Sequence, residues 1–380
     1  MKTALYTLVE GNWQAQITRQ EVDVAKVQLV ICFGAKEELR KTGLYEGVHR
    51  LFPQAQVLFG STAGEIMGEQ VLDDAVFLVA IEFEQTRIHS GSVNRRDFSS
   101  CYDAARALVK QLSSDGLKYI LVISDGSLVN GSELVRGLKD ATSPGVLVTG
   151  GLAGDGANFV STLTGLNANP AEGIISAIGF YGDKIVVNHG SQGGWDIFGP
   201  ERRVTRSTHN VLYEIDGKNA LALYKKYLGS EAAQLPGSAL LFPLSIIAPD
   251  SQTPVVRTIL SIDEEEQTMT FAGDLPEGSK VRFMKANFDK ITAAANIAAQ
   301  QTLGGYIQSP DFALLISCVG RKLILGPRIE EEVEAVREAL GPDTLLAGFY
   351  SYGEISPFNE GGSCQLHNQT MTITTFHELP

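Results

Sequence analysis

The feature that most constrains the fold is an alternation of short apolar runs with amphipathic segments in the first half of the chain. The strand-like runs are residues 27–34, 55–64, 75–83, 118–126 and 145–156. The helix-like segments between them are residues 35–53, 99–114 and 131–141. Strands that alternate with helices are typical of a mixed or largely parallel sheet with helices on its faces. The pattern therefore predicts an α/β fold.

The middle of the chain departs from this alternation. Residues 174–192 hold two apolar runs joined by Gly182 and Asp183, a two-residue turn that predicts a β-hairpin. A helix is expected at 219–229, and strand-like runs begin again near residue 238, with later helices at 288–303 and 330–340. We expect two domains, 1–214 and 215–380, each a mixed sheet covered by helices. The cleft between such domains is a common place for a ligand.

The tripeptide Gly-Glu-Ile occurs twice after a strand-like run. It occupies residues 64–66 in VLFGSTAGEIMGE and residues 353–355 in LLAGFYSYGEISPF. The shared context is an apolar run, a glycine and a few small or aromatic residues. This context favours equivalent structural positions over a chance repeat.

The composition excludes several kinds of partner. The chain carries 31 Lys and Arg against 44 Asp and Glu, a net charge of −13, whereas proteins that bind nucleic acid or anionic membranes need a basic surface. No apolar run approaches the roughly 20 residues that span a bilayer, and the four cysteines form no C-x-x-C pair. We expect a cytoplasmic protein with no nucleic-acid or membrane partner. Nothing in the composition opposes a homodimer.

Enzyme signatures are weak. GGLAGDG at 150–156 reverses the dinucleotide-binding spacing of glycines, and no P-loop occurs. GSTAG resembles a nucleophile elbow, but Thr62 stands at the central position and Ser61 is one place early. Asp125 ends a strand, where a turn residue is the more common role. We therefore expect a binding protein and not an enzyme.

One histidine differs from the other five in its surroundings. In KIVVNH the alternation of a strand places Ile185, Val187 and His189 on one face, so the imidazole continues an apolar surface to the end of the strand. Gly193 and Gly194 follow in the next turn, and their missing side chains would let a flat molecule approach the backbone. Trp195 adds an aromatic surface.

Three arginines come next, Arg202, Arg203 and Arg206, and arginine is well suited to holding carboxylates. An imidazole on an apolar wall, with glycines, an aromatic ring and nearby arginines, is what haem b requires: the histidine binds iron and the arginines meet the propionates. We therefore consider His189 as the axial ligand of a haem, with His209 as second choice. The alternative is a hydrogen-bonded histidine that closes the hairpin, with Trp195 in the core.

Polar residues also interrupt the apolar runs of the second half. They are Arg321 in CVGR, Tyr352 and Glu354 in YSYGEI, and Asn368 in LHNQT. These side chains either line a pocket between the domains, or Arg321 and Glu354 form a structural ion pair. The pair is the favoured interpretation.

The sequence resembles the FIST family of bacterial sensory proteins over nearly its full length. FGSTAGEI, GGLAGDGANF and RVTRSTHNVLYEIDGKNALALYKKYLG resemble the FIST N domain, whereas ALLISCVGR, AGFYSYGEISPF and LHNQTM resemble the FIST C domain. The resemblance implies a sensor of a small ligand. Since no kinase, cyclase or methyl-accepting segment is recognised, we expect it to signal through a separate protein.

The segment NHGSQGGWDIFGPERRVTR resembles the haem-binding, nitric-oxide-sensing branch of this family, often called NosP. That resemblance implies haem b held by a histidine, carried here onto His189, with nitric oxide as the signal. It implies a histidine kinase or a cyclic-di-GMP-metabolising enzyme as the partner. The rival hypothesis is a haem-free sensor that binds an amino acid or a similar metabolite between the domains.

Overall fold

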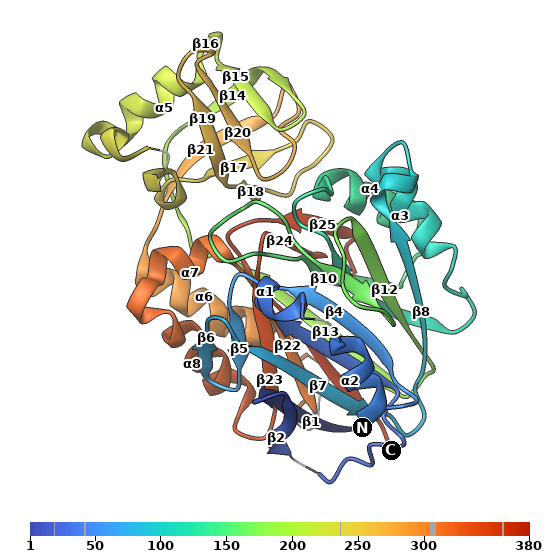
Figure 1. Ribbon diagram of the computed structural model, residues 1–380. Helices are drawn as coiled ribbons and strands as arrows, with labels where there is room; N and C mark the ends of the chain where they lie inside the picture. Colours follow the sequence, from blue (N-terminus) through green and yellow to red (C-terminus); the bar gives the residue numbers. More distant parts are fainter. Residues whose placement is uncertain (19, 42, 236, 305–308, 359–360) are drawn as a thin grey trace.

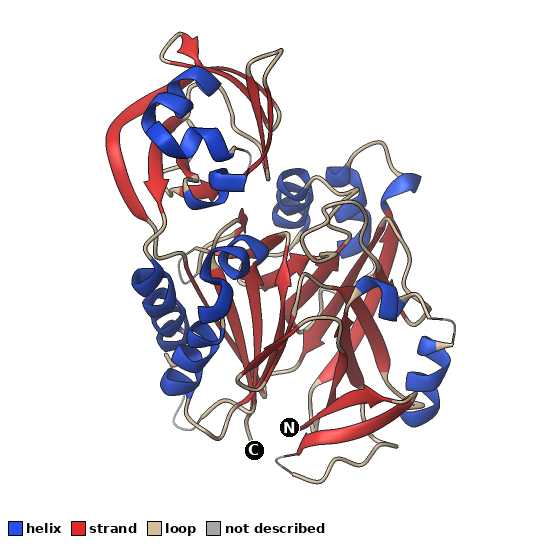
Figure 2. Ribbon diagram, turned by 60° about the vertical axis from the view of Figure 1, so that its left-hand side comes forward, coloured by secondary structure: helices blue, strands red, loops and turns tan. Residues whose placement is uncertain are grey.

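The computed structural model describes residues 1–18, 20–41, 43–235, 237–304, 309–358 and 361–380. Three six-stranded sheets, here named A, B and C, form a body, and residues 196–286 form a smaller lobe beside one end of it (Figures 1 and 2). Both termini lie at the end of the body away from the lobe (Figure 1). The fold is mixed α/β, as the sequence predicts.

Sheet A has the strand order β11-β4-β3-β7-β1-β2. Its strands are β1 (Lys2–Val9), β2 (Asn12–Thr18), β3 (Leu29–Gly34), β4 (Gln56–Ser61), β7 (Val76–Glu82) and β11 (Thr164–Leu166). β3 and β4 are parallel, and the chain between them forms α1 (Lys36–Leu39) and α2 (Leu44–Leu51). The single helix predicted at 35–53 is therefore wrong: two short helices stand there, and Gly43, at a φ of 84°, caps the second.

Sheet C has the order β25-β24-β10-β9-β12-β8. Its strands are β8 (Arg87–Asn94), β9 (Leu117–Ser124), β10 (Leu147–Leu152), β12 (Ile174–Tyr181), β24 (Gly353–Pro357) and β25 (Cys364–His367). β9 and β10 are parallel, and α3 (Cys101–Val109) and α4 (Gly131–Ala141) pack together beside this sheet, close to η1 (Arg95–Asp97). Ser100 caps α3 by accepting the Asp103 amide, as expected for a serine before a helix.

Sheet B has the order β13-β26-β22-β23-β5-β6. Its strands are β5 (Glu65–Met67), β6 (Gln70–Leu72), β13 (Ile185–Gln192), β22 (Phe312–Cys318), β23 (Leu345–Ser351) and β26 (Met371–Glu378). β22 and β23 are parallel. Its helical elements are α6 (Phe288–Gln301), α7 (Val319–Leu325), η4 (Gly326–Arg328) and α8 (Glu330–Leu340).

The lobe holds a strongly bent antiparallel sheet with a core of its own. Its strands are β14 (Asp196–Thr208), β15 (Val211–Ile215), β16 (Lys218–Asn219), β17 (Leu244–Ile247), β18 (Val255–Arg257), β19 (Ile259–Asp263), β20 (Thr268–Phe271) and β21 (Lys280–Lys285). Its helical elements are α5 (Ala220–Leu228), η2 (Gly229–Gln234) and η3 (Gly237–Leu241). Because the lobe lies between β13 and α6 in the chain, it is an insertion into the unit that builds sheet B.

The body repeats one arrangement three times. Each sheet has a parallel pair, which is β3–β4, β9–β10 or β22–β23. The first strand of the pair is antiparallel to a third strand, β7, β12 or β26. That third strand pairs on its other edge with β1, β8 or β13. A short strand after each pair crosses to another sheet: β5 joins β23, β24 joins β10, and β11 joins β4. The three inner faces share one apolar core, which buries Phe33, Ile123 and Ile316 completely or almost so. Burial of each such side chain stabilises the fold by about 1.5–3 kcal/mol.

This exchange confirms the equivalence of the two Gly-Glu-Ile segments. Glu65 and Ile66 begin β5, which pairs with β23, and Glu354 and Ile355 lie at the start of β24, which pairs with β10. After β10 the chain carries Gly154-Asp155 at a comparable but not identical position, and a loop separates this dipeptide from β11.

The predicted hairpin at 174–192 is wrong. β12 lies between β8 and β9 in sheet C, whereas β13 pairs with β26 in sheet B. Gly182, at a φ of 116°, lets the chain pass from one sheet to the other. Both edges of β12 are already paired, so its neighbour in sequence must find another strand.

Candidate functional site

A cavity of about 380 Å³ lies at the open edge between sheets B and C, and His189 is part of its wall. Its described lining is Gly145, Val146, Leu147, Val187, Asn188, His189, Gly190, Gln301, Gly304, Pro357, Phe358, Gly361 and Gly362. These residues come from both halves of the chain. The volume lies in the range of small-molecule sites, about 300–1,000 Å³. The wall combines apolar side chains with glycines and the polar Asn188, His189 and Gln301, and its exposed surface is more polar than apolar.

The register of the strands defines positions equivalent to His189 in the other two sheets. His189 pairs with Thr374, which pairs with Leu314 of the core. The same step in sheet C leads from Leu121 through Ile178 to Ser90, and in sheet A from Ile31 through Val79 to Leu5. His189, Ser90 and Leu5 therefore face three equivalent junctions between sheets.

Side chains close the other two junctions. At the junction of sheets C and A, Ser90 hydrogen-bonds to Gln56, and Asn167 donates to the same Gln56 oxygen at 2.8 Å. At the junction of sheets A and B, Leu5 and Leu345 are both buried in the common apolar core. At the junction of sheets B and C, the counterpart of Gln56 is Leu147, which makes no side-chain hydrogen bond with His189. A cavity with a half-buried imidazole thus replaces a packed junction.

A second histidine lies close to this cavity. His367 of β25 is buried, and its Nε2 lies 3.0 Å from the carbonyl oxygen of Ser356. Its ring stacks at 6.0 Å on Phe358, which lines the cavity. Burial, with smaller contributions from the charges of Arg257 and His189, lowers the pKa of His367 to about 4. His367 is therefore a neutral imidazole at physiological pH.

The glycines and the tryptophan after His189 contact protein. A Cβ on Gly194 would lie 2.3 Å from the Lys290 carbonyl oxygen, and a Cβ on Gly193 would lie 2.9 Å from the Trp195 ring. The Trp195 indole donates to the Gln369 carbonyl oxygen at 2.9 Å. None of the three belongs to the described wall of the cavity. The glycines serve the close approach of this segment to α6.

The predicted carboxylate-binding arginines lie on β14 in the lobe. Arg202 pairs with Asp216 at 2.9 Å and donates to the Tyr227 hydroxyl. Arg206 pairs with Glu214 at 3.3 Å. Arg203 is exposed, and His209 is an exposed turn residue at a φ of 51°. The structure does not bring these side chains into the described wall of the cavity.

Arg321 has a structural role, but its partner is not Glu354. The predicted pair is wrong: Arg321 binds Glu332 at 2.8 Å, and both side chains are completely buried. The remaining donors of Arg321 bind the carbonyl oxygens of Gly193 and Ile291 at 2.7 and 2.9 Å. Glu354 instead accepts from Ser351 and from Thr370. Sequence spacing offers no signal for Glu332, which α8 presents from the far side of β22.

Three buried carboxylates, those of Glu65, Asp155 and Glu354, each follow one of the parallel strand pairs. They were not predicted as a set from the sequence. Glu65 accepts from Thr62 and from the Ala75 amide, and burial raises its pKa to about 7. Burial likewise raises the pKa of Glu354 to about 8. The shared signal was the Gly-Glu or Gly-Asp dipeptide, of which the sequence comparison identified two copies.

Asp155, the third of this set, holds a loop in place. Burial alone would raise its pKa, but hydrogen bonds from Tyr352, from the amides of residues 160 and 161 and from Lys36 lower it overall. Tyr352 donates to this carboxylate and stacks on Phe159 at 4.6 Å. Tyr352 therefore orders the loop at 155–161. Asp125 is similarly occupied, since it accepts from the Ser127 and Gly173 amides.

The turn after β25 carries unpaired polar groups. Asn368 and Gln369 are at most 1% exposed, and neither side-chain amide has a hydrogen-bond partner for its oxygen or its nitrogen. Buried polar groups without a partner cost about 1–3 kcal/mol each, and most such groups in proteins bind ordered water or a ligand.

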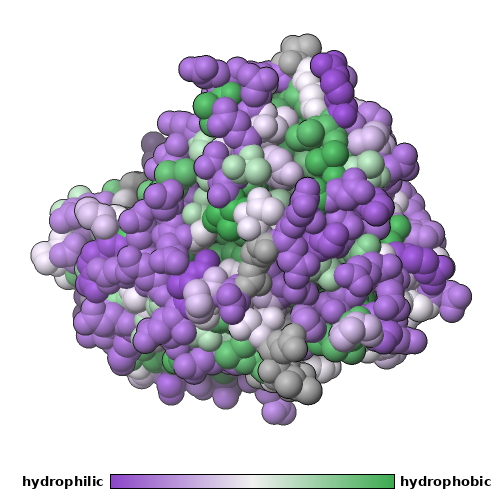
Figure 3. Space-filling model, turned by 90° about the horizontal axis from the view of Figure 1, so that it is seen from below, coloured by the Kyte–Doolittle hydropathy of each residue, from purple (hydrophilic) through white to green (hydrophobic). Residues whose placement is uncertain are grey.

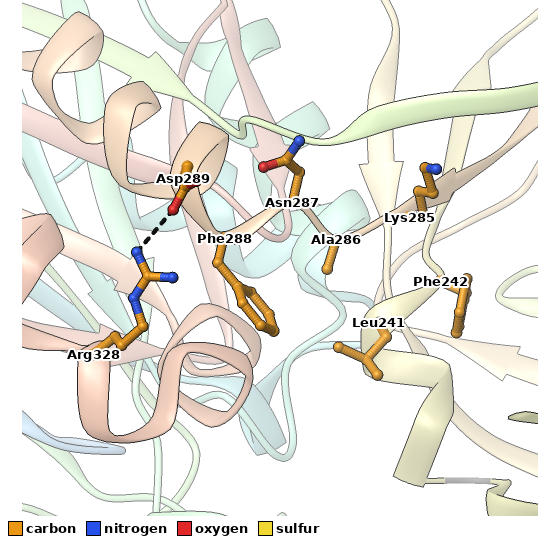
Figure 4. Close-up of a pocket in the computed structure, with 8 residues that line it drawn as sticks. All are labelled: Leu241, Phe242, Lys285, Ala286, Asn287, Phe288, Asp289 and Arg328. Atoms are coloured by element: carbon orange, nitrogen blue, oxygen red, sulfur yellow. Dashed lines mark hydrogen bonds and ion pairs between the residues drawn. The ribbon is translucent and has the colours of Figure 1, made fainter.

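A second hollow of about 460 Å³ lies where the lobe meets the body. Leu241 and Phe242 of the lobe face Phe288 of α6 across it, and Arg328 pairs with Asp289 at its edge (Figure 4). The opposite end of the molecule is mostly hydrophilic, with hydrophobic residues in separate patches (Figure 3).

The described residues hold neither a cluster of metal ligands nor a membrane-spanning helix. No group of three or more His, Cys, Asp or Glu side chains is arranged to hold a metal ion. None of the described helices is long and apolar enough to cross a membrane.

Fold and site together define a mixed α/β protein with an inserted lobe and a cavity between two of its sheets. The FIST N domain matches residues 28–218 and the FIST C domain matches residues 220–357. The chain therefore belongs to the FIST family, whose domains are sensory modules of signalling proteins. A comparison with curated protein sequences gave no match.

Two solved structures show a distant likeness. One is described as a crystal structure of cyanuric acid hydrolase from A. caulinodans, with 7% identity and a TM-score of 0.37 over 94% of this chain and 92% of that one. The other, titled "Cyanuric acid hydrolase: evolutionary innovation by structural concatenation", has 11% identity and a TM-score of 0.32 over the same shares. Scores this low carry no conclusion about activity.

Proposed function

We propose that the protein senses a small ligand in the cavity beside His189, and that this ligand is haem b with His189 on the iron. The observation that supports the proposal is the difference between the three junctions. Two are packed, whereas the third is open and carries an imidazole. Haem requires an axial ligand and an apolar wall; His189 would supply the ligand, and Val187 and Phe358 would supply an apolar part of the wall.

The fit does not extend to the propionates. The described wall contains no arginine or lysine, and Arg202 and Arg206 are paired with carboxylates in the lobe. The axial imidazole and the apolar surface therefore carry the proposal.

When bound, a ferrous haem would supply the chemistry that binds nitric oxide, and His189 is the residue that would hold it. The protein's part is to hold the imidazole on β13, whose opposite face is packed so closely on α6 that a Cβ on Gly190 would lie 2.0 Å from the Ala298 carbonyl oxygen. Asn188 fixes the same strand to the end of α6 by donating to the Thr302 and Gly304 carbonyl oxygens. A change at His189 thus acts on a strand whose two neighbouring residues, Asn188 and Gly190, are held against α6 and its C-terminal end. A separate histidine kinase or cyclic-di-GMP enzyme in the cytoplasm is the proposed reader.

The test is the absorption spectrum of the protein after addition of haemin, before and after reduction and exposure to nitric oxide. We expect a Soret band in the wild type that is lost or shifted in His189→Ala. His89→Ala is the matched control, because His89 lies on β8, which is an edge strand of sheet C as β13 is of sheet B, but does not line the cavity. A wild type that takes up no haemin, or two variants with identical spectra, would refute the haem proposal.

A second candidate rests on the unpaired amides of Asn368 and Gln369. Two adjacent carboxamides offer donors and acceptors to a compact polar molecule such as an amino acid. This function predicts a rise in melting temperature with free amino acids that is abolished in Asn368→Leu and unchanged in His189→Ala. Absence of any shift across the twenty amino acids would remove this candidate.

A further inference from the structure

The lobe touches the body at a small number of polar contacts besides its two chain crossings. Arg257 of β18 donates to the Leu366 carbonyl oxygen of β25 at 3.0 Å. The Asp274 amide donates to Ser132 at 3.1 Å, and its carboxylate accepts from Asn130, the N-cap of α4. These contacts fix the angle between lobe and body, because both crossings, near residues 193–196 and 285–288, lie on the other side (Figure 1).

The crossings themselves are firmly attached to the body. The Arg321 guanidinium binds the Gly193 carbonyl oxygen of one crossing and the Ile291 carbonyl oxygen next to the other. Asp196 at the start of β14 pairs with Lys290. Gly194 has a φ of 80°, which few other residues adopt without strain. The lobe is therefore anchored at one edge, and Arg257 holds the opposite edge.

Arg257 makes a contact that opens at low cost. The side chain is 7% exposed, and it donates hydrogen bonds to the backbone carbonyl oxygens of Val256, Asp274 and Leu366. Burial lowers its pKa to about 10, so the group stays charged at neutral pH while paying the cost of desolvation. A buried guanidinium without a bound carboxylate regains hydration when it is exposed. The free energy of hydrating the exposed guanidinium offsets much of the free energy that is lost when its hydrogen bonds break.

The antiparallel pair of strands β24 and β25 connects the Arg257–Leu366 contact to the cavity. β24 ends in Pro357, which lines the cavity together with Phe358, and β25 carries Leu366, which pairs with Ile355 of β24. His367 lies within electrostatic reach of both His189 and Arg257. A ligand that displaces Phe358 or the glycines at 361 and 362 therefore acts on the strand whose carbonyl group receives Arg257.

We propose that the Arg257–Leu366 hydrogen bond is a latch between lobe and body, and that a ligand in the His189 cavity releases it. This inference rests on the proposed function for its ligand. It adds the structural change that ligand binding would cause, which is a rotation of the lobe about the crossings at 193–196 and 285–288. The partner would then distinguish the liganded from the empty sensor by the position of the lobe. Two arrangements biased by one ligand are what a sensor needs.

The test measures the distance between lobe and body by pulsed electron spin resonance. Spin labels are attached to Lys226→Cys on α5 and Glu338→Cys on α8, both exposed positions, whereas the four native cysteines are buried. Four samples are compared: wild type, wild type with haemin, Arg257→Gln, and the control Arg282→Gln, an exposed arginine of the same lobe. Ser132→Ala weakens the same interface from the body side and replaces Arg257→Gln if that variant fails to fold.

We expect the distance distribution to broaden or shift in Arg257→Gln and in the haemin-loaded wild type, and to stay unchanged in Arg282→Gln. Because coupling between sites is reciprocal, Arg257→Gln should also bind haemin about fivefold or more tightly than the wild type. An unchanged distribution in Arg257→Gln overturns the latch. Haemin that binds at His189 without moving the lobe overturns the coupling and leaves the haem proposal standing. Failure to bind haemin ends that proposal, while the Arg257→Gln distances still decide on the latch.

Discussion

Arg321 and Glu332 form an ion pair that is entirely withdrawn from solvent, with Nη2 2.8 Å from the carboxylate oxygen. Ser317 and Tyr350 donate to the other carboxylate oxygen, so every acceptor position of Glu332 faces a donor of the body. The guanidinium in turn holds both chain crossings to the lobe. One buried pair thus joins α7 and α8 to the base of the inserted lobe.

Glu332→Gln should lower the free energy of unfolding by about 3–5 kcal/mol, because it leaves the Arg321 charge buried without its counter-charge. Equilibrium unfolding in urea measures the change. Glu331→Gln is the matched control: its neighbour pair with Arg328 is partly exposed, and such pairs contribute about 0–1 kcal/mol. Equal effects of the two substitutions would contradict the structural role assigned to the buried pair.

Glu354 should make the protein less stable as the pH rises. Its pKa is raised to about 8 in the folded state by burial, against about 4.3 in an unfolded chain. The folded state therefore holds the proton more tightly: the stabilisation is complete below about pH 4.3 and is lost as the pH rises through about 8. The limiting slope is about 1.4 kcal/mol per pH unit for one proton.

Urea titrations between these pH values, in wild type and Glu354→Gln, measure this dependence. The amide cannot ionise, so the variant should show a flatter profile and should be more stable than the wild type at the alkaline end. Burial gives Glu65 a raised pKa of about 7, so a smaller slope should remain in Glu354→Gln. Identical profiles in the two proteins would show that Glu354 is ionised in the folded state.

Gly194 should be needed for packing and not for a ligand. Gly194→Ala places a methyl group 2.3 Å from the Lys290 carbonyl oxygen at a φ of 80°, which combines overpacking with backbone strain. Gly217→Ala is the control, because Gly217 has a φ of 67° with no atom within 4 Å of the new methyl group. Gly194→Ala should lose about 1–3 kcal/mol more than this control in thermal or urea unfolding. If both lose the same amount, only the backbone conformation matters.

The elements with strong local patterns could be predicted from the sequence. The strand-like runs at 27–34 and 118–126 became β3 and β9, and the helix expected at 219–229 forms as α5. The hairpin at Gly182 failed because turn chemistry describes only the local bend, whereas the pairing of β12 and β13 depends on strands elsewhere in the chain. Local pattern cannot specify which long-range partner a strand will find.

The site could be predicted only in part for the same reason. The alternation of apolar residues placed Val187 and His189 on one face, and both line the cavity. The arginines at 202 and 206 lie close to His189 in sequence but on the other side of the crossing into the lobe, where Asp216 and Glu214 bind them. Leu147 and Phe358, which line the same cavity, come from segments far away in the sequence. Proximity along the chain was taken for proximity in space.

Asn368 offers a test of whether its buried amide is unpaired in the molecule in solution. If nothing binds it, Asn368→Leu removes an amide whose burial is uncompensated, and the free energy of unfolding should stay constant or rise by about 1 kcal/mol. Asn188→Leu is the contrasting variant, because it deprives the Thr302 and Gly304 carbonyl oxygens of their donor; about 1–3 kcal/mol should be lost. Urea unfolding in the absence of added ligand compares the two. A loss at Asn368 as large as that at Asn188 would mean that water or a retained ligand satisfies the Asn368 amide, so that the amide is not unpaired in solution.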